Sequence, residues 1–227
     1  MAKKILFALT SHGTLGDTGR STGFYVPEVA HPAAVFRAAG YEVAYVSVRG
    51  GQPPQDGYDA GDAVQAAFLA DPATAAALAA TAAPGELSPG DYDAVFFAGG
   101  HGAMWDLPGC APLAGLAAGV YERGGVVAAV CHGPAGLVDI RLGDGSYLVE
   151  GKQVSTFTNE EEQAVGLTEV VPFLLESRLA ERGAKITKTA NFAAHAVADQ
   201  RLVTGQNPAS AVRVAELVVE QLEARAA

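Results

Sequence analysis

The sequence predicts an α/β protein with a flavodoxin-like, doubly wound sheet that is mostly parallel and carries helices on both faces. Short apolar runs alternate along the chain with segments that have helical start and stop signals. The runs are nearly continuous, as is typical of parallel strands covered on both sides. Strands and helices alternating in this way form parallel sheets through right-handed crossovers. Because 227 residues can bury one large core, we expect residues 1–227 to form a single domain.

Four apolar runs are the expected strands. They are KKILFALT, EVAYVSV, DAVFFAG and GVVAAV, at residues 3–10, 42–48, 93–99 and 125–130. The segments between them carry helix signals: one ends at Gly40, and another starts with Asp71 as N-cap and Pro72 in the first turn. A third helix is expected over residues 111–125.

The clearest helix lies at the C-terminal end of the sequence. Asn207 is its expected N-cap and Pro208 opens it. An apolar stripe at helical spacing predicts the buried face; it consists of Ala211, Val214, Ala215, Val218 and Leu222.

Two segments interrupt the alternation. Residues 49–62 are rich in Gly, Pro and Asp, which indicates an excursion on the surface. Residues 141–154 contain an Asp-Gly turn, which predicts a hairpin.

Composition and charge exclude several classes of function. The net charge of −10 argues against nucleic acid and against an anionic membrane as the main partner. No apolar segment reaches the roughly 20 residues of a membrane helix, and the N-terminus is not a convincing signal peptide. Two cysteines without an export signal argue against a disulfide scaffold. We therefore expect a cytoplasmic protein with free thiols.

The candidate nucleophile is Cys131, which ends the fourth apolar run in the stretch GGVVAAVCHGPAGL. Sites in open α/β sheets form at the carboxyl ends of the strands. Ala129 and Gly133 flank the cysteine at the small-x-nucleophile-x-small spacing of a nucleophile elbow. A helix with Pro134 in its first turn would place the sulfur at a helix N-terminus, which predicts a lowered thiol pKa. The His132 N–H would face an oxyanion. The alternative is a buried cysteine that packs as a small hydrophobe.

A second glycine-rich loop, FFAGGHGAMWDLPG, ends another apolar run. Its glycines permit close approach of the backbone, so N–H groups at Gly100, His101 and Gly102 could complete an oxyanion hole or bind substrate. The alternative is a turn that binds no ligand. The spacing does not fit a phosphate loop.

The combination of AVCHGP with AGGHGAMWDLP resembles the PfpI-like superfamily, which has the class I glutamine amidotransferase-like fold. The more specific resemblance is to the glyoxalase III branch, also described as small heat-shock chaperones. It extends through PEVAHPAAVFRAAGYEVAYVS, LVEGKQVSTFTNEEE and RLVTGQNPAS. The stretch SHGTLGDTGRSTG departs from the expected pattern and places His12 near the site.

The resemblance implies the roles of individual residues. Cys131 matches the nucleophile, His132 the neighbouring base, and Glu28 the carboxylate that approaches the nucleophile. Glu162 is the best match to the acid that orients the histidine, with Glu160 and Glu161 as alternatives. Each carboxylate could instead be part of a solvated helix start. The remaining candidates are expected to be structural or surface residues; they are Cys110, His31 and His195.

The resemblance implies a glutathione-independent glyoxalase III of the D-lactate dehydratase type, which converts methylglyoxal to lactate through a hemithioacetal on Cys131. We expect no cofactor, no metal, a small reactive aldehyde as substrate and a homodimer. Three alternatives stay open: a deglycase acting on glyoxal-modified protein or nucleotide, a cysteine amidase or peptidase, and a stress holdase or redox sensor. A glutamine amidotransferase proper does not fit, because neither a synthetase domain nor a separate His-x-Glu partner is evident.

Overall fold

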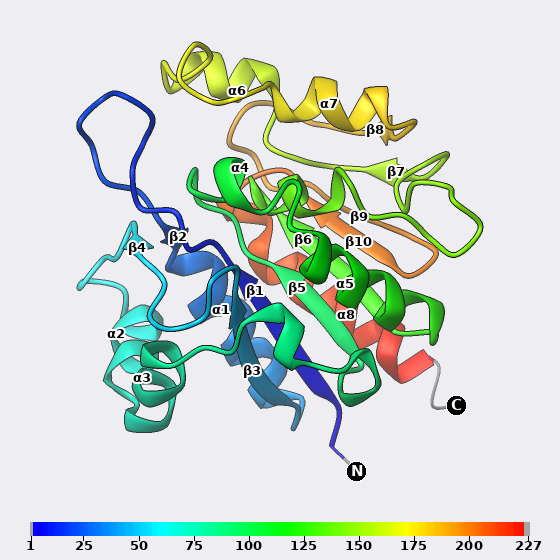
Figure 1. The fold of residues 1–227 in the computed structure, drawn as a ribbon. Coiled ribbons are helices and arrows are strands. Elements are labelled where there is room, and N and C mark those ends of the chain that lie inside the picture. The colour runs from blue at the N-terminus through cyan, green and yellow to red at the C-terminus, as the bar shows by residue number, and fades with distance from the viewer. Residues whose placement is uncertain (1, 225–227) are drawn as a thin grey trace.

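A six-stranded sheet forms the centre of the computed structural model, which describes residues 2–224 (Figure 1). Neighbouring strands are parallel except for the last pair, β10 and β9, which is antiparallel. The mostly parallel sheet is therefore confirmed, and all four predicted runs lie in it. The strand order is β3 (Glu42–Ser47), β1 (Lys4–Leu9), β5 (Ala94–Phe97), β6 (Val126–Val130), β10 (Leu202–Gly205) and β9 (Ala196–Asp199).

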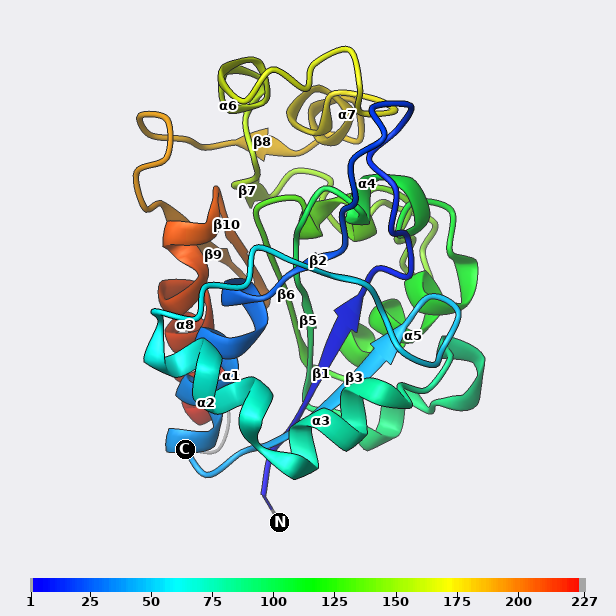
Figure 2. The same cartoon turned by 90° about the vertical axis from the view of Figure 1, so that its left-hand side faces the viewer.

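Helices cover both faces of this sheet, as predicted (Figure 2). One face packs against α1 (Pro27–Ala38) and α8 (Ala211–Ala224), and the other packs against α5 (Ala111–Glu122). Alternate residues of β1 enter the two cores, with Phe7 on the α1 side and Leu6 on the α5 side. Because both faces are covered, β5 and β6 are buried along their whole length. The predicted apolar stripe of the last helix is the buried face of α8.

The predicted helix N-cap at Asp71 is confirmed, and the predicted N-cap at Asn207 is wrong. The Asp71 side chain accepts hydrogen bonds from the first turn of α3 (Pro72–Ala79). The preceding α2 (Ala63–Ala70), which the sequence analysis did not predict, is capped by Asp62 in the same way. Asn207 precedes a 3₁₀ turn, η4 (Pro208–Ser210), and its side-chain amide donates to Glu161 instead of capping. The end of the predicted last helix, residues 225–227, lies outside the described residues.

The predicted hairpin over residues 141–154 is wrong. A turn at Asp144 and Gly145 closes a single antiparallel bridge between Arg141 and Tyr147. The chain then leaves this pairing, and β7 (Gln153–Val154) pairs in parallel with β8 (Lys185–Ile186). An Asp-Gly turn marks a reversal of the chain but does not fix the partner of the strand that follows.

Short elements gather above the carboxyl ends of the central strands (Figure 1). The surface excursion at residues 49–62 contains β4 (Gln55–Asp56), which pairs with β2 (Phe24–Tyr25). Within residues 2–224 no helix is long and apolar enough to cross a membrane. The remaining short elements are α4 (Ala103–Asp106), η3 (Gly133–Leu137), α6 (Asn159–Ala164) and α7 (Leu175–Glu181). Two further 3₁₀ turns, η1 (Pro84–Glu86) and η2 (Pro89–Asp91), come before β5 instead.

Candidate active site

Cys131 occupies a tight, strained turn at the carboxyl end of β6. Its φ of 59° lies in the left-handed region, which a residue with a side chain rarely adopts. The turn also needs glycine at position 133, because a Cβ there would lie 2.1 Å from the Phe97 carbonyl oxygen. The Cys131 carbonyl accepts hydrogen bonds from the Phe157 N–H and the Thr156 hydroxyl. These features give the turn at Cys131 the strained geometry that the predicted nucleophile elbow requires.

His132 connects the thiol to a carboxylate of α6. Its Nδ1 lies 3.4 Å from Cys131 Sγ, and its Nε2 lies 2.8 Å from Glu162 Oε2. The imidazole is 1% exposed and the Glu162 side chain 4%, so water competes little for these bonds. The Nε2–H bond to Glu162 leaves the Nδ1 lone pair facing the sulfur, as a general base requires.

Only Glu162 of the three consecutive glutamates reaches His132. Glu160 is at the surface, 3.4 Å from Lys188. Glu161 is buried, and its carboxylate accepts hydrogen bonds from Thr158 and Phe192 backbone N–H groups and from two side-chain amides. Thr158 and Glu161 form a capping box at the start of α6. This box fixes the rotation of the short helix, so that the next residue, Glu162, points at the imidazole.

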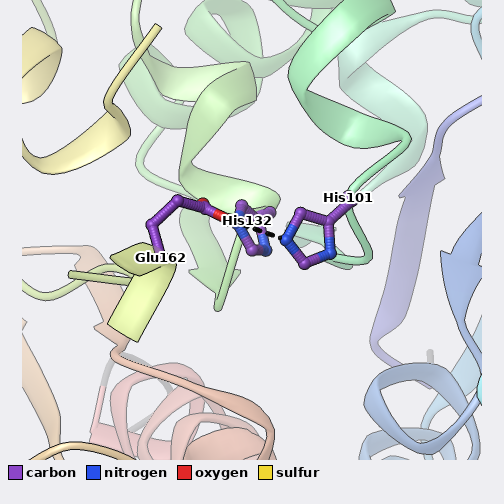
Figure 3. Close-up of side chains that lie close together, drawn as sticks. All are labelled: His101, His132 and Glu162. Carbon is purple, nitrogen blue, oxygen red and sulfur yellow. Dashed lines mark hydrogen bonds and ion pairs between the residues drawn. The ribbon is translucent and has the colours of Figure 1, made fainter. Parts of the chain in front are cut away.

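A second histidine binds the same carboxylate (Figure 3). His101 Nε2 lies 2.9 Å from Glu162 Oε1, and its ring centroid is 4.1 Å from that of His132. The sequence predicts oxyanion or substrate binding for His101. The structure directs its ring to Glu162 instead, so that one carboxylate holds two imidazoles.

Glu28 approaches the site from the first turn of α1 and is completely buried. Its Oε2 accepts a hydrogen bond of 2.7 Å from the Gly99 N–H, and the Cys131 thiol is its other polar neighbour. A Cβ on residue 99 would lie 2.5 Å from that oxygen, so glycine is required there. Burial raises the pKa of Glu28 to about 8, although the hydrogen bonds from Cys131 and Gly99 oppose the rise.

The pKa of the Cys131 thiol is raised, and the predicted lowering is wrong. Burial is the main cause, and the neighbouring Glu28 adds to it. The N–H groups of His132 and Gly100 lower this pKa but do not outweigh the burial. The expected helix after Cys131 is only the five-residue 3₁₀ turn η3, which supplies little dipole. The thiol therefore keeps its proton at neutral pH.

His132 and Glu162 have the charges that a base and its partner need in order to take up the thiol proton. Burial, followed by the neighbouring His101, lowers the pKa of His132 to about 4. At neutral pH the imidazole is therefore uncharged and able to accept a proton. Although burial acts to raise the pKa of Glu162, hydrogen bonds from His101 and His132 lower it to about 2.

The candidate oxyanion donors divide into two groups. The N–H groups of Gly100 and His132 are directed at the Cys131 sulfur, and a Cβ on residue 100 would lie 2.2 Å from the Gly23 carbonyl oxygen. In contrast, the Gly102 N–H donates to the Thr22 hydroxyl at 3.1 Å and is not free for a substrate oxygen.

His12, which the sequence analysis placed near the substrate, has other partners. Its Nε2 lies 2.5 Å from the Thr14 carbonyl oxygen, and its ring stacks on Trp105 with centroids 5.1 Å apart. Most of the predicted site residues therefore lie together in the structure; they are Cys131, His132, Glu28, Glu162 and Gly100. His101 joins them through its bond to Glu162. Gly102 and His12 make other contacts.

Two aromatic residues near the site were missed by the sequence analysis. The Phe157 ring lies against His132, with centroids 4.4 Å apart. The other residue is Tyr25, whose backbone N–H donates to the Gly99 carbonyl at 3.0 Å. Burial raises the pKa of its phenol, and the charges of Glu28 and Cys131 raise it further. Their positions beside Glu28 in FYVPE and before the glutamates in STFTNEEE were the available signals.

Similar proteins and structures share this fold over nearly their whole length. "Glyoxalase 3" of Candida albicans is 37% identical, with 97% of this chain and 98% of that protein covered. The glutathione-independent glyoxalase HSP31 of Saccharomyces cerevisiae is 35% identical, with the same coverage of 97% and 98%. The crystal structure of glyoxalase III from Candida albicans has a TM-score of 0.88 at 33% identity, covering 96% of this chain and 97% of that one. The Rapid Encystment Protein of Francisella tularensis has a TM-score of 0.93 at 34% identity, covering 97% and 99%. A model of the DJ-1/PfpI family matches residues 22–221, and the chain therefore belongs to that family.

Proposed function

We propose that the protein is a glutathione-independent glyoxalase that converts methylglyoxal into lactate. The observation that carries this proposal is the hydrogen-bonded series Cys131–His132–Glu162 with a protonated carboxyl, Glu28, buried beside the thiol. Relatives that are named glyoxalases and match over nearly the full length support the same chemistry.

The first step joins the sulfur to the aldehyde carbon. His132 Nδ1, 3.4 Å from the sulfur, accepts the thiol proton as the S–C bond forms. The aldehyde oxygen becomes an oxyanion, which the N–H groups of Gly100 and His132 stabilise. The thiol proton then passes to this oxygen. The product is a neutral hemithioacetal, and the imidazole is again free.

The second step moves hydrogen between the two substrate carbons. His132 removes the proton from the former aldehyde carbon, and the electron pair forms a double bond to the ketone carbon, giving an enediolate. The imidazolium, held by Glu162, then protonates the ketone carbon. The hydroxyl proton of the first carbon moves to the second oxygen, and the Glu28 carboxyl can accept one proton and return another. A lactoyl thioester results.

The third step releases the product. Water adds to the thioester, the S–C bond breaks, and the sulfur regains a proton. Lactate leaves with both oxygen atoms of the substrate and one from water. No electron acceptor is needed, because one carbon is oxidised while its neighbour is reduced.

The test is lactate formation from methylglyoxal in the absence of glutathione. We expect turnover by the wild type and by Glu160→Gln, which changes a surface carboxylate of the same helix. Cys131→Ala should be inactive while remaining folded. Wild-type protein that forms no lactate, or an equally active Cys131→Ala variant, would show that the proposal is wrong. A homodimer and a cytoplasmic location belong to the same proposal, and light scattering and cell fractionation test them.

A further inference from the structure

Two imidazoles and one carboxylate converge at one edge of the site (Figure 3). We propose that His101, His132 and Glu162 bind a divalent transition-metal ion of the zinc class, and that this ion reversibly inhibits the enzyme. Neither the sequence spacing nor the proposed reaction calls for a metal here. The distances, the burial and the charge of these three side chains favour one.

The donor atoms are already close to the separations that a metal requires. One atom from each residue lies within 4.8 Å of the others. The two imidazole nitrogens are 2.9 and 2.8 Å from the carboxylate oxygens. Around a tetrahedral zinc with bonds of ~2.0–2.2 Å, ligand atoms lie roughly 3.3–3.5 Å apart. Small rotations of the side chains therefore suffice, and imidazole with carboxylate is a donor set that suits zinc, copper and nickel.

Burial and charge also favour a cation. The Glu162 side chain is 4% exposed, and within residues 2–224 its ion-pair partners are the two histidines alone. A carboxylate this deeply buried attracts a cation strongly, because the dielectric around it is low. The His101 side chain is 21% exposed and provides the side from which an ion and a completing water ligand could enter.

Metal binding would change the hydrogen-bonding role of His132. In the metal-free site, Nε2–H donates to Glu162 and the Nδ1 lone pair faces the sulfur. An ion on Nε2 requires the single ring proton to move to Nδ1, so no proton leaves the imidazole. Nδ1–H then faces Cys131 Sγ and cannot accept the thiol proton. Inhibition thus rests on the proposed function, whereas binding of the ion does not.

Binding is tested directly, with Co²⁺ followed by its visible absorption and with Zn²⁺ followed by calorimetry. We expect one ion per chain for the wild type and unchanged affinity for Cys131→Ala, because the sulfur is not a ligand. Glu162→Gln and His101→Asn should each weaken binding by at least ~10- to 100-fold, the range seen even for loss of an outer-shell partner. The matched controls are Glu160→Gln and His31→Asn, which change surface groups paired with Lys188 and Asp62 and should bind normally.

Each outcome decides the question. Absence of binding to the wild type, loss of binding in Cys131→Ala, or normal binding in both Glu162→Gln and His101→Asn would overturn the proposed site. Thermal unfolding of each variant shows whether lost binding reflects lost structure. Zinc should abolish lactate formation, and a chelator should restore it. If the metal-free wild type forms no lactate, the glyoxalase proposal fails while the binding result stands. If metal binds to these residues and turnover continues unchanged, the inhibitory role is wrong.

Discussion

The buried carboxyl of Glu28 predicts that removing its charge makes the protein more stable at neutral and alkaline pH. Burial raises the pKa of this group in the folded protein from 4.5 to about 8. The folded protein therefore keeps the proton at pH values where the unfolded chain has released it. The part of the free energy of unfolding that depends on this proton is fully present below about pH 4.5 and is lost as the pH rises towards 8.

The size of the effect follows from the shift in pKa. One pKa unit corresponds to about 1.4 kcal/mol, so the full rise from 4.5 to about 8 corresponds to about 5 kcal/mol, and the part lost by pH 7 to about 3 kcal/mol. Glu28→Gln keeps the shape and an oxygen that can accept the Gly99 N–H bond, but it cannot ionise. The variant should therefore be more stable than the wild type by amounts of this order while losing catalytic activity.

Urea unfolding at pH 4.5, 7 and 9 measures this difference. The free energy of unfolding should be nearly equal for both proteins at the lowest pH, and Glu28→Gln should gain an advantage as the pH rises. Glu160→Gln is the control, because its exposed carboxylate gives no reason for a similar trend. A difference that does not depend on pH, or a wild type that is the more stable protein at pH 9, would show that burial does not raise the pKa of Glu28 in this way.

Three further substitutions test other parts of the site. Glu162→Gln should lower kcat by ~100-fold or more, because the neutral amide cannot stabilise the His132 imidazolium; equal kcat for Glu162→Gln and Glu160→Gln would contradict this. Gly100→Ala should cost more than about 2 kcal/mol of stability and remove activity, since a φ of +97° is strained for alanine and its Cβ would meet the Gly23 carbonyl; a normal melting temperature would contradict it. Glu161→Gln should lower the free energy of unfolding by about 2–3 kcal/mol, because its buried carboxylate accepts four hydrogen bonds. Urea unfolding measures this loss. An unchanged unfolding midpoint would show that the charge of the Glu161 carboxylate does not stabilise the fold.

Local patterns allowed the sheet and the nucleophile to be predicted. The β6 run is apolar throughout because both faces of the strand are buried, and this property is visible in the sequence itself. The spacing of small residues around Cys131 is likewise visible among neighbouring positions, although the contact that requires glycine at position 133 comes from the backbone of β5. Features set by contacts between neighbours along the chain could therefore be predicted.

Features set by distant contacts could not be predicted from local pattern. The rotation of α6, which selects Glu162 over its neighbours, depends on the capping box and on bonds from Phe192, Gln206 and Asn207. The partner of β7 lies about thirty residues further along the chain. The pKa of Cys131 depends on burial and on Glu28, which another element supplies. Apart from the capping box, which is local, the groups that decide these features are far away in the sequence.

The most direct test of the proposed chemistry is a single-turnover reaction with methylglyoxal, quenched in acid and analysed by mass spectrometry of the intact and digested protein. The hemithioacetal and the lactoyl thioester are isomers, so both add the mass of one methylglyoxal to the peptide that carries Cys131. We expect this adduct to form before lactate appears, to decay at the rate at which lactate accumulates, and to be absent from Cys131→Ala. Lactate formed by the wild type without any transient adduct on Cys131, or with an adduct that outlasts product formation, would contradict the account.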